Sequence, residues 1–413
     1  MPIDSDVLTA IAHEFGTPVW VYDAQTIRDR IALLHRFDVV RYAQKANANT
    51  HLLRLMRAAG VRVDAVSHGE LVRSLAAGFT PPEIVFTADL IDRQTRALVM
   101  QHGIQVNCGS VDMIEALGAQ SPGHAVWLRI NPGFGHGHSP KTNTGGVHSK
   151  HGVWIDDVPQ ALAAIRRHGL RLVGVHMHIG SGTDYAHLAQ VCDAMVAAVE
   201  RFGLDVEAIS AGGGLPDQHD AAQIDQYFAL WDAARQRIAA RLGHPIALEI
   251  EPGRFLVAAS GVLLTEVHAV KDTPAHRFVL VDAGFNDLVR PAFYGSRHPI
   301  SLVSTDATSP PRALRDVVVA GPLCEAGDVF TQSREGMLAP CCLPDPQVGD
   351  LLALHEAGAY GASMSSAYNS RPLAPEVLVD GAGHRCIRHR QSIDALIALE
   401  TPVPTPIGNS TVA

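Results

Sequence analysis

The chain has 413 residues, a formal net charge of −9, 47% hydrophobic residues and 18% charged residues. This length exceeds one ordinary domain, so we expect two domains around sizeable cores. The acidic balance and the lack of any Lys/Arg run argue against nucleic acid as a partner, and no apolar stretch approaches the ~20 residues that span a bilayer. The N-terminus lacks the features of a signal peptide, and the six scattered cysteines form no Cys-x-x-Cys pair. We therefore expect a cytoplasmic enzyme without a disulfide framework or a zinc site.

Short apolar runs alternate with amphipathic, helix-like segments between about residues 18 and 254. The eight runs are residues 39–42, 61–65, 84–87, 104–106, 126–130, 172–176, 206–210 and 246–250. A strand-helix repeat predicts a parallel sheet, and eight repeats fit a (β/α)8 barrel. A doubly wound open sheet would also alternate, but no Gly-x-Gly-x-x-Gly motif follows the first strand, which favours the barrel.

Polar or glycine residues follow almost every predicted strand. In chain order they are Lys45, 67–70, Thr87 with Asp89, 107–110, Arg129 with Asn131, 176–181, 212–214 and 251–254. Because barrel enzymes build their active sites at the carboxyl ends of the strands, we expect these residues to surround one site.

The pattern changes after about residue 255. Apolar runs at 262–270, 278–281, 317–320, 351–354 and 376–379 are separated by Gly/Pro/Asp turns without long helices. This is typical of a mostly antiparallel β domain, a barrel or a sandwich. We expect it to span residues 255–400, with residues 1–17 packed against it and residues 401–413 forming a disordered tail.

Lys45 is one of four lysines in the chain and closes the first apolar strand. Burial of an ammonium is costly and favours the neutral amine, which is a nucleophile suited to forming a Schiff base. The alternative is a lysine whose side chain reaches the surface from the strand end.

A glycine triplet, Gly212 to Gly214, follows the seventh strand, and Glu-Pro-Gly-Arg follows the eighth at residues 251–254. Barrels often bind phosphate at these two loops, where backbone N–H groups can approach an anion. Ser181 adds a hydroxyl near a helix start. The alternative for the glycines is a tight turn.

His176 and His178 lie on the same side of one strand. We favour a ring stacked on a planar cofactor over a metal pair, because no third ligand stands at a fitting spacing. His136 and His138 are interpreted as loop residues.

An amine, a phosphate cradle, an acid and a stacking imidazole together predict pyridoxal 5'-phosphate. An acid at the pyridine nitrogen favours decarboxylation.

These motifs resemble those of the diaminopimelate decarboxylases, pyridoxal-phosphate enzymes with a barrel fold that are grouped with ornithine decarboxylase and alanine racemase. The similarity runs from residues 15–23 (FGTPVWVYD) to Arg371-Pro372. Residues 42–46 (YAQKA) resemble the segment of the cofactor lysine, and residues 176–181 (HMHIGS) the segment whose second histidine stacks on the ring. Residues 251–254 resemble the acid at the pyridine nitrogen and a substrate-binding arginine.

The resemblance implies decarboxylation of meso-2,6-diaminopimelate to L-lysine and CO2, the last step of lysine biosynthesis. It also implies a homodimer whose active sites are shared between the subunits. By the same resemblance, Lys45, His178, Ser181, Gly213, Gly214, Glu251 and Tyr360 bind the cofactor, Arg254, Arg290, Tyr294, Glu325 and Tyr360 bind the substrate, and Cys324 donates a proton. Cys324 could instead only pack, with Lys45 or water as the proton donor.

One residue departs from the family pattern, because Ala326 stands where the family loop commonly has serine after Cys-Glu. This leaves a decarboxylase of D-lysine or D-ornithine on the same scaffold as an alternative, although those substrates lack the distal carboxylate. A racemase is disfavoured by the acid Glu251. A non-catalytic cofactor-binding protein is disfavoured by the large second domain that carries site residues.

Overall fold

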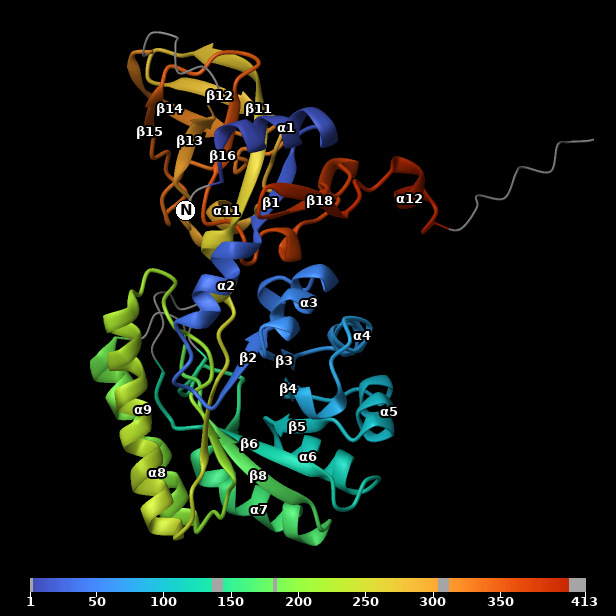
Figure 1. The fold of residues 1–413 in the computed structure, drawn as a ribbon, viewed down its shortest axis with the longest axis vertical. Coiled ribbons are helices and arrows are strands. Elements are labelled where there is room, and N and C mark those ends of the chain that lie inside the picture. The colour runs from blue at the N-terminus through green and yellow to red at the C-terminus, as the bar shows by residue number, and fades with distance from the viewer. Residues whose placement is uncertain (1–2, 136–143, 181–183, 304–311, 401–413) are drawn as a thin grey trace, which may run out of the picture.

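The computed structural model describes residues 3–135, 144–180, 184–303 and 312–400. Two sheets organise it, one in the lower half of Figure 1 and one in the upper half. His136 and His138, Ser181 and the predicted tail at 401–413 lie outside the described residues. Among the described helices, none is long and apolar enough to cross a membrane.

The first sheet is a closed parallel barrel, as predicted. Its strands are β2 (Val39–Ala43), β3 (Arg62–Ala65), β4 (Ile84–Ala88), β5 (Gln105–Cys108), β6 (Ala125–Asn131), β8 (Arg171–His176), β9 (Ala208–Ser210) and β10 (Ala247–Ile250). They pair in the order β5-β4-β3-β2-β10-β9-β8-β6, and β5 also pairs with β6, which closes the ring. The short β7 (Val153–Trp154) pairs with β6 outside the ring.

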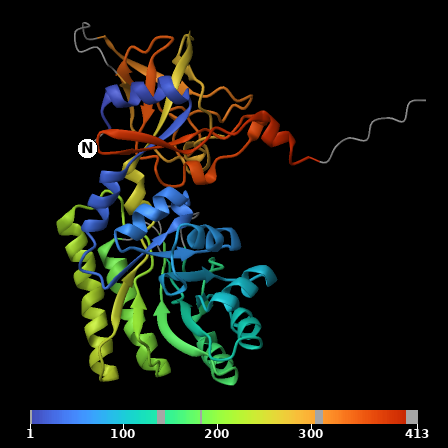
Figure 2. The ribbon, with the colours of Figure 1, turned by 45° about the vertical axis from the view of Figure 1, so that its right-hand side comes forward.

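Helices surround the barrel on its outer side (Figures 1 and 2). They are α3 (Thr50–Ala58), α4 (His68–Ala76), α5 (Arg93–His102), α6 (Val111–Gly118), α7 (Val158–Arg167), α8 (Tyr185–Phe202) and α9 (Ala221–Leu242). Helix α2 (Ala24–Ala32) lies between the two halves of the chain in Figure 1. The 3-10 turns η1 (Gln44–Ala46), η2 (Pro81–Glu83) and η4 (Ile155–Asp157) complete this half. Helix α9 shows how the sequence encodes these helices. Asp220 forms a capping box with Gln223, and the apolar face of Ile224, Phe228 and Trp231 is buried, as its spacing predicts.

The second sheet is mixed and strongly curled. Its strands are β1 (Val19–Asp23), β11 (Gly261–Asp272), β12 (Arg277–Val281), β13 (Ile300–Val303), β14 (Leu314–Ala320), β15 (Cys341–Pro344), β16 (Leu351–Leu354), β17 (Glu376–Asp380) and β18 (Gly383–Arg388). Six pairings among the described residues are antiparallel, as expected. Two are parallel, β1 with β17 and β12 with β14. Short helices α10 (Arg254–Val257), α11 (Arg290–Tyr294) and α12 (Ile393–Ile397) and 3-10 turns η5 (Ala258–Ser260), η6 (Ala362–Met364) and η7 (Tyr368–Ser370) complete this half.

The N-terminal segment belongs with the second sheet. Helix α1 (Ser5–Phe15) buries Leu8 and Ile11 against a core that includes Val19 and Val377. Strand β1 follows it and pairs with β11 and β17. We therefore propose that the barrel domain starts after β1, near residue 24, rather than at the predicted residue 18.

The two halves meet at the carboxyl end of β2. The amide of Tyr360 donates a hydrogen bond to the carbonyl of Ala46 at 2.8 Å, and the hydroxyl of Ser363 donates to the same carbonyl at 3.0 Å. Since Ala46 follows β2 directly, the second half of the chain covers the carboxyl ends of the barrel strands. Residues from both halves are thereby brought to one place.

A buried ion pair links two neighbouring barrel strands, Arg41 on β2 and Glu249 on β10. Nε of Arg41 lies 2.5 Å from Oε2 of Glu249, and Nη2 lies 3.1 Å from Oε1. Because both side chains are buried, Glu249→Ala leaves an uncompensated charge, and we expect the free energy of unfolding to fall by about 3–5 kcal/mol. Urea unfolding measures this.

The matched control is the double variant Arg41→Met/Glu249→Met, which removes both charges. We expect it to be clearly more stable than the single variant, because no buried charge remains unpaired. Equal unfolding midpoints for the two variants would contradict the assigned role of the pair.

Candidate active site

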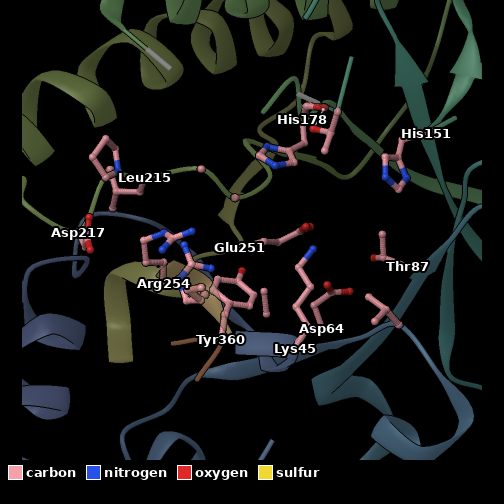
Figure 3. A pocket seen from close by; sticks show the side chains of 18 of the residues that line it. Lys45, Asp64, Thr87, His151, His178, Leu215, Asp217, Glu251, Arg254 and Tyr360 are labelled. Carbon is pink, nitrogen blue, oxygen red and sulfur yellow. Dashed lines mark hydrogen bonds between the residues drawn. The ribbon is translucent and has the colours of Figure 1, made fainter. Parts of the chain in front are cut away.

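One cavity of about 840 Å³ lies at the carboxyl ends of the barrel strands (Figure 3). Residues from both halves of the chain line it. The predicted site residues among them are Lys45, His178, Gly213, Gly214, Glu251, Arg254, Arg290 and Tyr360. The structure therefore brings together eight residues that were predicted from separate stretches of the sequence.

Lys45 lies in the 3-10 turn η1, directly after β2. Its neighbours Gln44 and Ala46 are buried, but its own side chain is exposed and projects into the cavity. Figure 3 shows its amine pointing toward Glu251, with Asp64 beside it. The prediction of a buried amine is wrong, because the turn at the strand end aims the side chain out of the core.

Asp64 is a site residue that sequence reasoning missed. It lies on β3, is buried and lines the cavity. Burial raises its pKa well above the ordinary value, as does repulsion from Glu251, while a hydrogen bond from Thr87 and attraction to Lys45 oppose the rise. The signal in the sequence was a carboxylate between two apolar strand residues, Val63 and Ala65.

Glu251 follows β10 and is held by two side chains, one from the neighbouring strand β9 and one from β8. Nε2 of His176 lies 3.1 Å from Oε2 of Glu251, and the hydroxyl of Ser210 donates to Oε1 at 2.7 Å. Burial alone would raise the pKa of Glu251, but attraction to His176 and the hydrogen bonds from His176 and Ser210 outweigh it and lower the pKa to about 2. The carboxylate is therefore ionised at neutral pH despite being buried.

His178 stands across the cavity from Lys45 in Figure 3. Burial lowers its pKa well below the ordinary value, and repulsion from Arg129 and Lys45 adds to the shift. The imidazole is therefore neutral at pH 7. A neutral, flat ring in this position suits the predicted stacking on a planar cofactor.

The glycine triplet is required by close packing. A Cβ on Gly213 would lie 2.8 Å from the carbonyl oxygen of Glu251, and one on Gly214 would lie 2.4 Å from that of Gly180. Gly214 also has φ of +95°, where side chains are strained. Within the described part of the chain, the amides of Gly213 and Gly214 have no hydrogen-bond acceptor. They are available to an anion, as the predicted cradle requires.

Two arginines and a tyrosine form the other end of the cavity. The guanidinium carbons of Arg254 and Arg290 lie 5.1 Å and 5.4 Å from the ring centre of Tyr360. Burial lowers the pKa of Arg290 to about 10, and repulsion from Arg254 contributes. Arg290 is thus still a cation at neutral pH. A ligand carboxylate would offset both the burial of this charge and its repulsion from Arg254.

Tyr294, predicted to bind the substrate, lies beside Arg290 in the structure. It is not among the described residues that line the cavity, and its ring centre lies 5.1 Å from the guanidinium carbon of Arg290. Tyr294 thus contacts the cavity residue Arg290 directly. The two residues were predicted together from the sequence, and both lie on α11.

Cys324 and Glu325 are both exposed and are not among the residues that line this cavity. The amide of Cys324 donates to Oδ1 of Asn369 at 3.1 Å. Within one chain, these two predicted site residues therefore stand apart from the other eight.

A second carboxylate-imidazole pair, Asp89 and His151, also lines the cavity. Nδ1 of His151 lies 2.5 Å from Oδ2 of Asp89, and the amide of Gly152 donates to Oδ1 at 2.8 Å. Burial would raise the pKa of Asp89, but these hydrogen bonds lower it. Asp89 was expected in the site from its place after a strand, whereas no pattern in the sequence pointed to His151.

Known proteins resemble this chain over nearly its whole length. A family model described as pyridoxal-dependent decarboxylase, pyridoxal binding domain, matches residues 24–258. The diaminopimelate decarboxylase of Escherichia coli strain K12 is 60% identical over 407 residues, covering 96% of this chain and 97% of that protein. That of Streptomyces coelicolor is 58% identical and covers 96% of this chain and 92% of its own length.

Solved structures of diaminopimelate decarboxylases also resemble this chain. A crystal structure of diaminopimelate decarboxylase superposes with a TM-score of 0.92 at 59% identity and covers 96% of both chains. A Helicobacter pylori diaminopimelate decarboxylase complexed with L-lysine gives a TM-score of 0.82 at 30% identity, covering 95% of this chain and 98% of its own.

The residues present fit pyridoxal phosphate, the cofactor of the matched family. The open amides of Gly213 and Gly214 suit its phosphate, and the ionised Glu251 suits its pyridine nitrogen. Lys45 offers an amine in the same cavity. We propose these as the roles of the four residues.

Gly214→Ala tests the cradle. The added Cβ would meet the carbonyl of Gly180, so we expect pyridoxal phosphate to bind at least about tenfold more weakly, the loss of one good polar contact. Absorbance titration of the apoenzyme with the cofactor measures this. The control is Gly349→Ala, where φ is +91° and no atom lies within 4 Å of the added Cβ. Equal weakening in both variants would attribute the effect to backbone strain alone.

Proposed function

The chain belongs to the diaminopimelate decarboxylase family, and we propose that it converts meso-2,6-diaminopimelate to L-lysine and CO2. It is accordingly a pyridoxal-phosphate-dependent carboxy-lyase. The observation that carries the proposal is the cavity itself, with an ionised Glu251 beside Lys45 at one end and two arginines at the other. The two arginines suit the distal carboxylate of a dicarboxylate substrate.

The cofactor end uses residues of the barrel. When bound, pyridoxal phosphate supplies an electron sink that stabilises negative charge at the α-carbon of the substrate. Lys45 binds the cofactor through its amine, and Glu251 keeps the pyridine nitrogen protonated. The neutral ring of His178 packs against the cofactor ring. Gly213 and Gly214 hold the phosphate, together with Tyr360 and with Ser181 as the resemblance implies.

The substrate end uses residues of the second half. Arg254 and Arg290 bind the distal carboxylate, where planar guanidinium groups add directional specificity. Tyr294 holds Arg290 in place through their ring contact. D-Lysine and D-ornithine offer no distal carboxylate, and they would leave the buried Arg290 cation without a negatively charged group of the substrate. This favours the dicarboxylate over the alternative substrates.

We further propose that two chains form a homodimer in which Cys324 and Glu325 complete the site of the other subunit. Their exposure, away from the cavity of their own chain, supports this. Glu325 of the partner subunit then binds the distal ammonium. Cys324 of the partner subunit protonates the α-carbon after CO2 leaves; the alternative keeps Cys324 as a packing residue, with Lys45 or water as the donor.

Release of CO2 from meso-diaminopimelate, D-lysine and D-ornithine tests the function. We expect the cofactor-loaded protein to act on diaminopimelate and to form L-lysine. Arg290→Gln should lower kcat/KM for diaminopimelate by about 30-fold or more, because a buried charge pair is lost, and should leave any D-lysine reaction unchanged. Arg297→Gln, at an exposed residue that lines the same cavity, serves as the control. Release from the monocarboxylates alone would assign a different substrate.

Subunit mixing tests the shared site. Lys45→Ala and the double variant Cys324→Ala/Glu325→Ala should each be inactive. After exchange in equal amounts, half of the dimers carry one intact site, so activity should recover to about a quarter of wild type. Native mass spectrometry confirms that mixed dimers form. Mixed dimers without activity would place Cys324 and Glu325 in the site of their own chain or outside it.

A further inference from the structure

Three buried residues form a connected network at the exits of adjacent barrel strands. His176 ends β8, Ser210 ends β9 and Glu251 follows β10. His176 and Ser210 are register partners, and the amide of Glu251 donates to the carbonyl of Gly212 at 2.8 Å. The backbone of three strands therefore fixes the separation of the three side chains.

The tautomer of His176 follows from its surroundings. Its Nδ1 is buried and, among the described residues, has no hydrogen-bond partner. A proton there would be a buried donor without an acceptor, which is costly. In the neutral imidazole the proton is therefore assigned to Nε2, and in either charge state Nε2 donates to Oε2 of Glu251 at 3.1 Å. A Cβ on Gly212 would lie only 3.1 Å from Nε2, so a larger residue at this position would crowd the ring.

We propose that His176 and Ser210 are positioning residues that fix the orientation and the ionised state of Glu251 toward the cofactor's pyridine nitrogen. Each donates to a different carboxylate oxygen, so the carboxylate cannot rotate without losing a hydrogen bond. A carboxylate has about four lone-pair sites, and two remain for the cofactor. This inference rests on the proposed function, which assigns Glu251 to the pyridine nitrogen.

The electrostatic surroundings support the assignment. Besides His176, the charged or titratable groups that interact with Glu251 include Arg41, Arg129, Asp64, Tyr227 and His178. The amine of Lys45 also points toward Glu251 (Figure 3). Hydrogen bonds from His176 and Ser210 lower the pKa of Glu251. Without His176, we expect the pKa of Glu251 to rise. Glu251 would then become neutral at acidic pH, and the pyridine nitrogen would lose its proton in that pH range.

The test is ¹⁵N NMR of the holoenzyme loaded with pyridoxal phosphate labelled at the pyridine nitrogen. In the wild type we expect the shift of a protonated nitrogen across neutral pH. His176→Leu and Ser210→Ala should move the shift toward the unprotonated value and lower kcat by about tenfold with KM nearly unchanged. His176→Gln, which can keep an N–H donor, should restore most of both readouts.

His124→Leu is the matched control, because His124 is also buried and Nε2 of its ring bonds to a backbone carbonyl, that of Ile104 at 2.7 Å. It should leave the ¹⁵N shift unchanged. A wild-type signal of a protonated nitrogen that persists in His176→Leu and Ser210→Ala overturns the positioning role alone. An unprotonated nitrogen in the wild type overturns the role proposed for Glu251 itself. Should His176→Leu not fold, Ser210→Ala and His176→Gln still decide between these outcomes.

Discussion

The structure depends on keeping one carboxylate ionised where water is largely excluded. Glu251 is buried at the mouth of the barrel, where burial favours the neutral acid. Donors from the ends of β8 and β9 reverse that preference, because a buried carboxylate is stable only when its oxygens are hydrogen-bonded. Closure of the barrel places these strand ends side by side, so the fold and the charge state of this residue are directly connected.

The two halves of the chain divide the chemistry between them. In the proposed mechanism the barrel supplies the amine, the acid, the stacking ring and the glycine cradle, and all four follow barrel strands. The second half supplies Arg290 and Tyr360 and covers the opening, with Tyr360 bonded to the carbonyl beside Lys45. The two guanidinium groups lie against the ring of Tyr360, which gathers the positive charge around one side chain. A substrate with two different ends can thus bind in one direction.

Sequence reasoning succeeded where the signal was local. The eight barrel strands, the glycine triplet and Glu251 follow from short apolar runs and from the residues directly after them. It failed where distant packing decides the outcome. Lys45 is exposed because the turn η1 directs it into the cavity, and β1 joins the second sheet through pairing with strands more than 200 residues away. The contact of His151 with Asp89 joins two separate loops, which no periodicity could indicate.

The most direct test of the account is a crystal structure of the pyridoxal-phosphate-loaded protein. The account predicts a covalent bond from Nζ of Lys45 to the cofactor and a hydrogen bond between Glu251 and the pyridine nitrogen. It also predicts that Nε2 of His176 and the hydroxyl of Ser210 still contact the same carboxylate. A pyridine nitrogen directed away from Glu251, or a cofactor bound without Lys45, would contradict it.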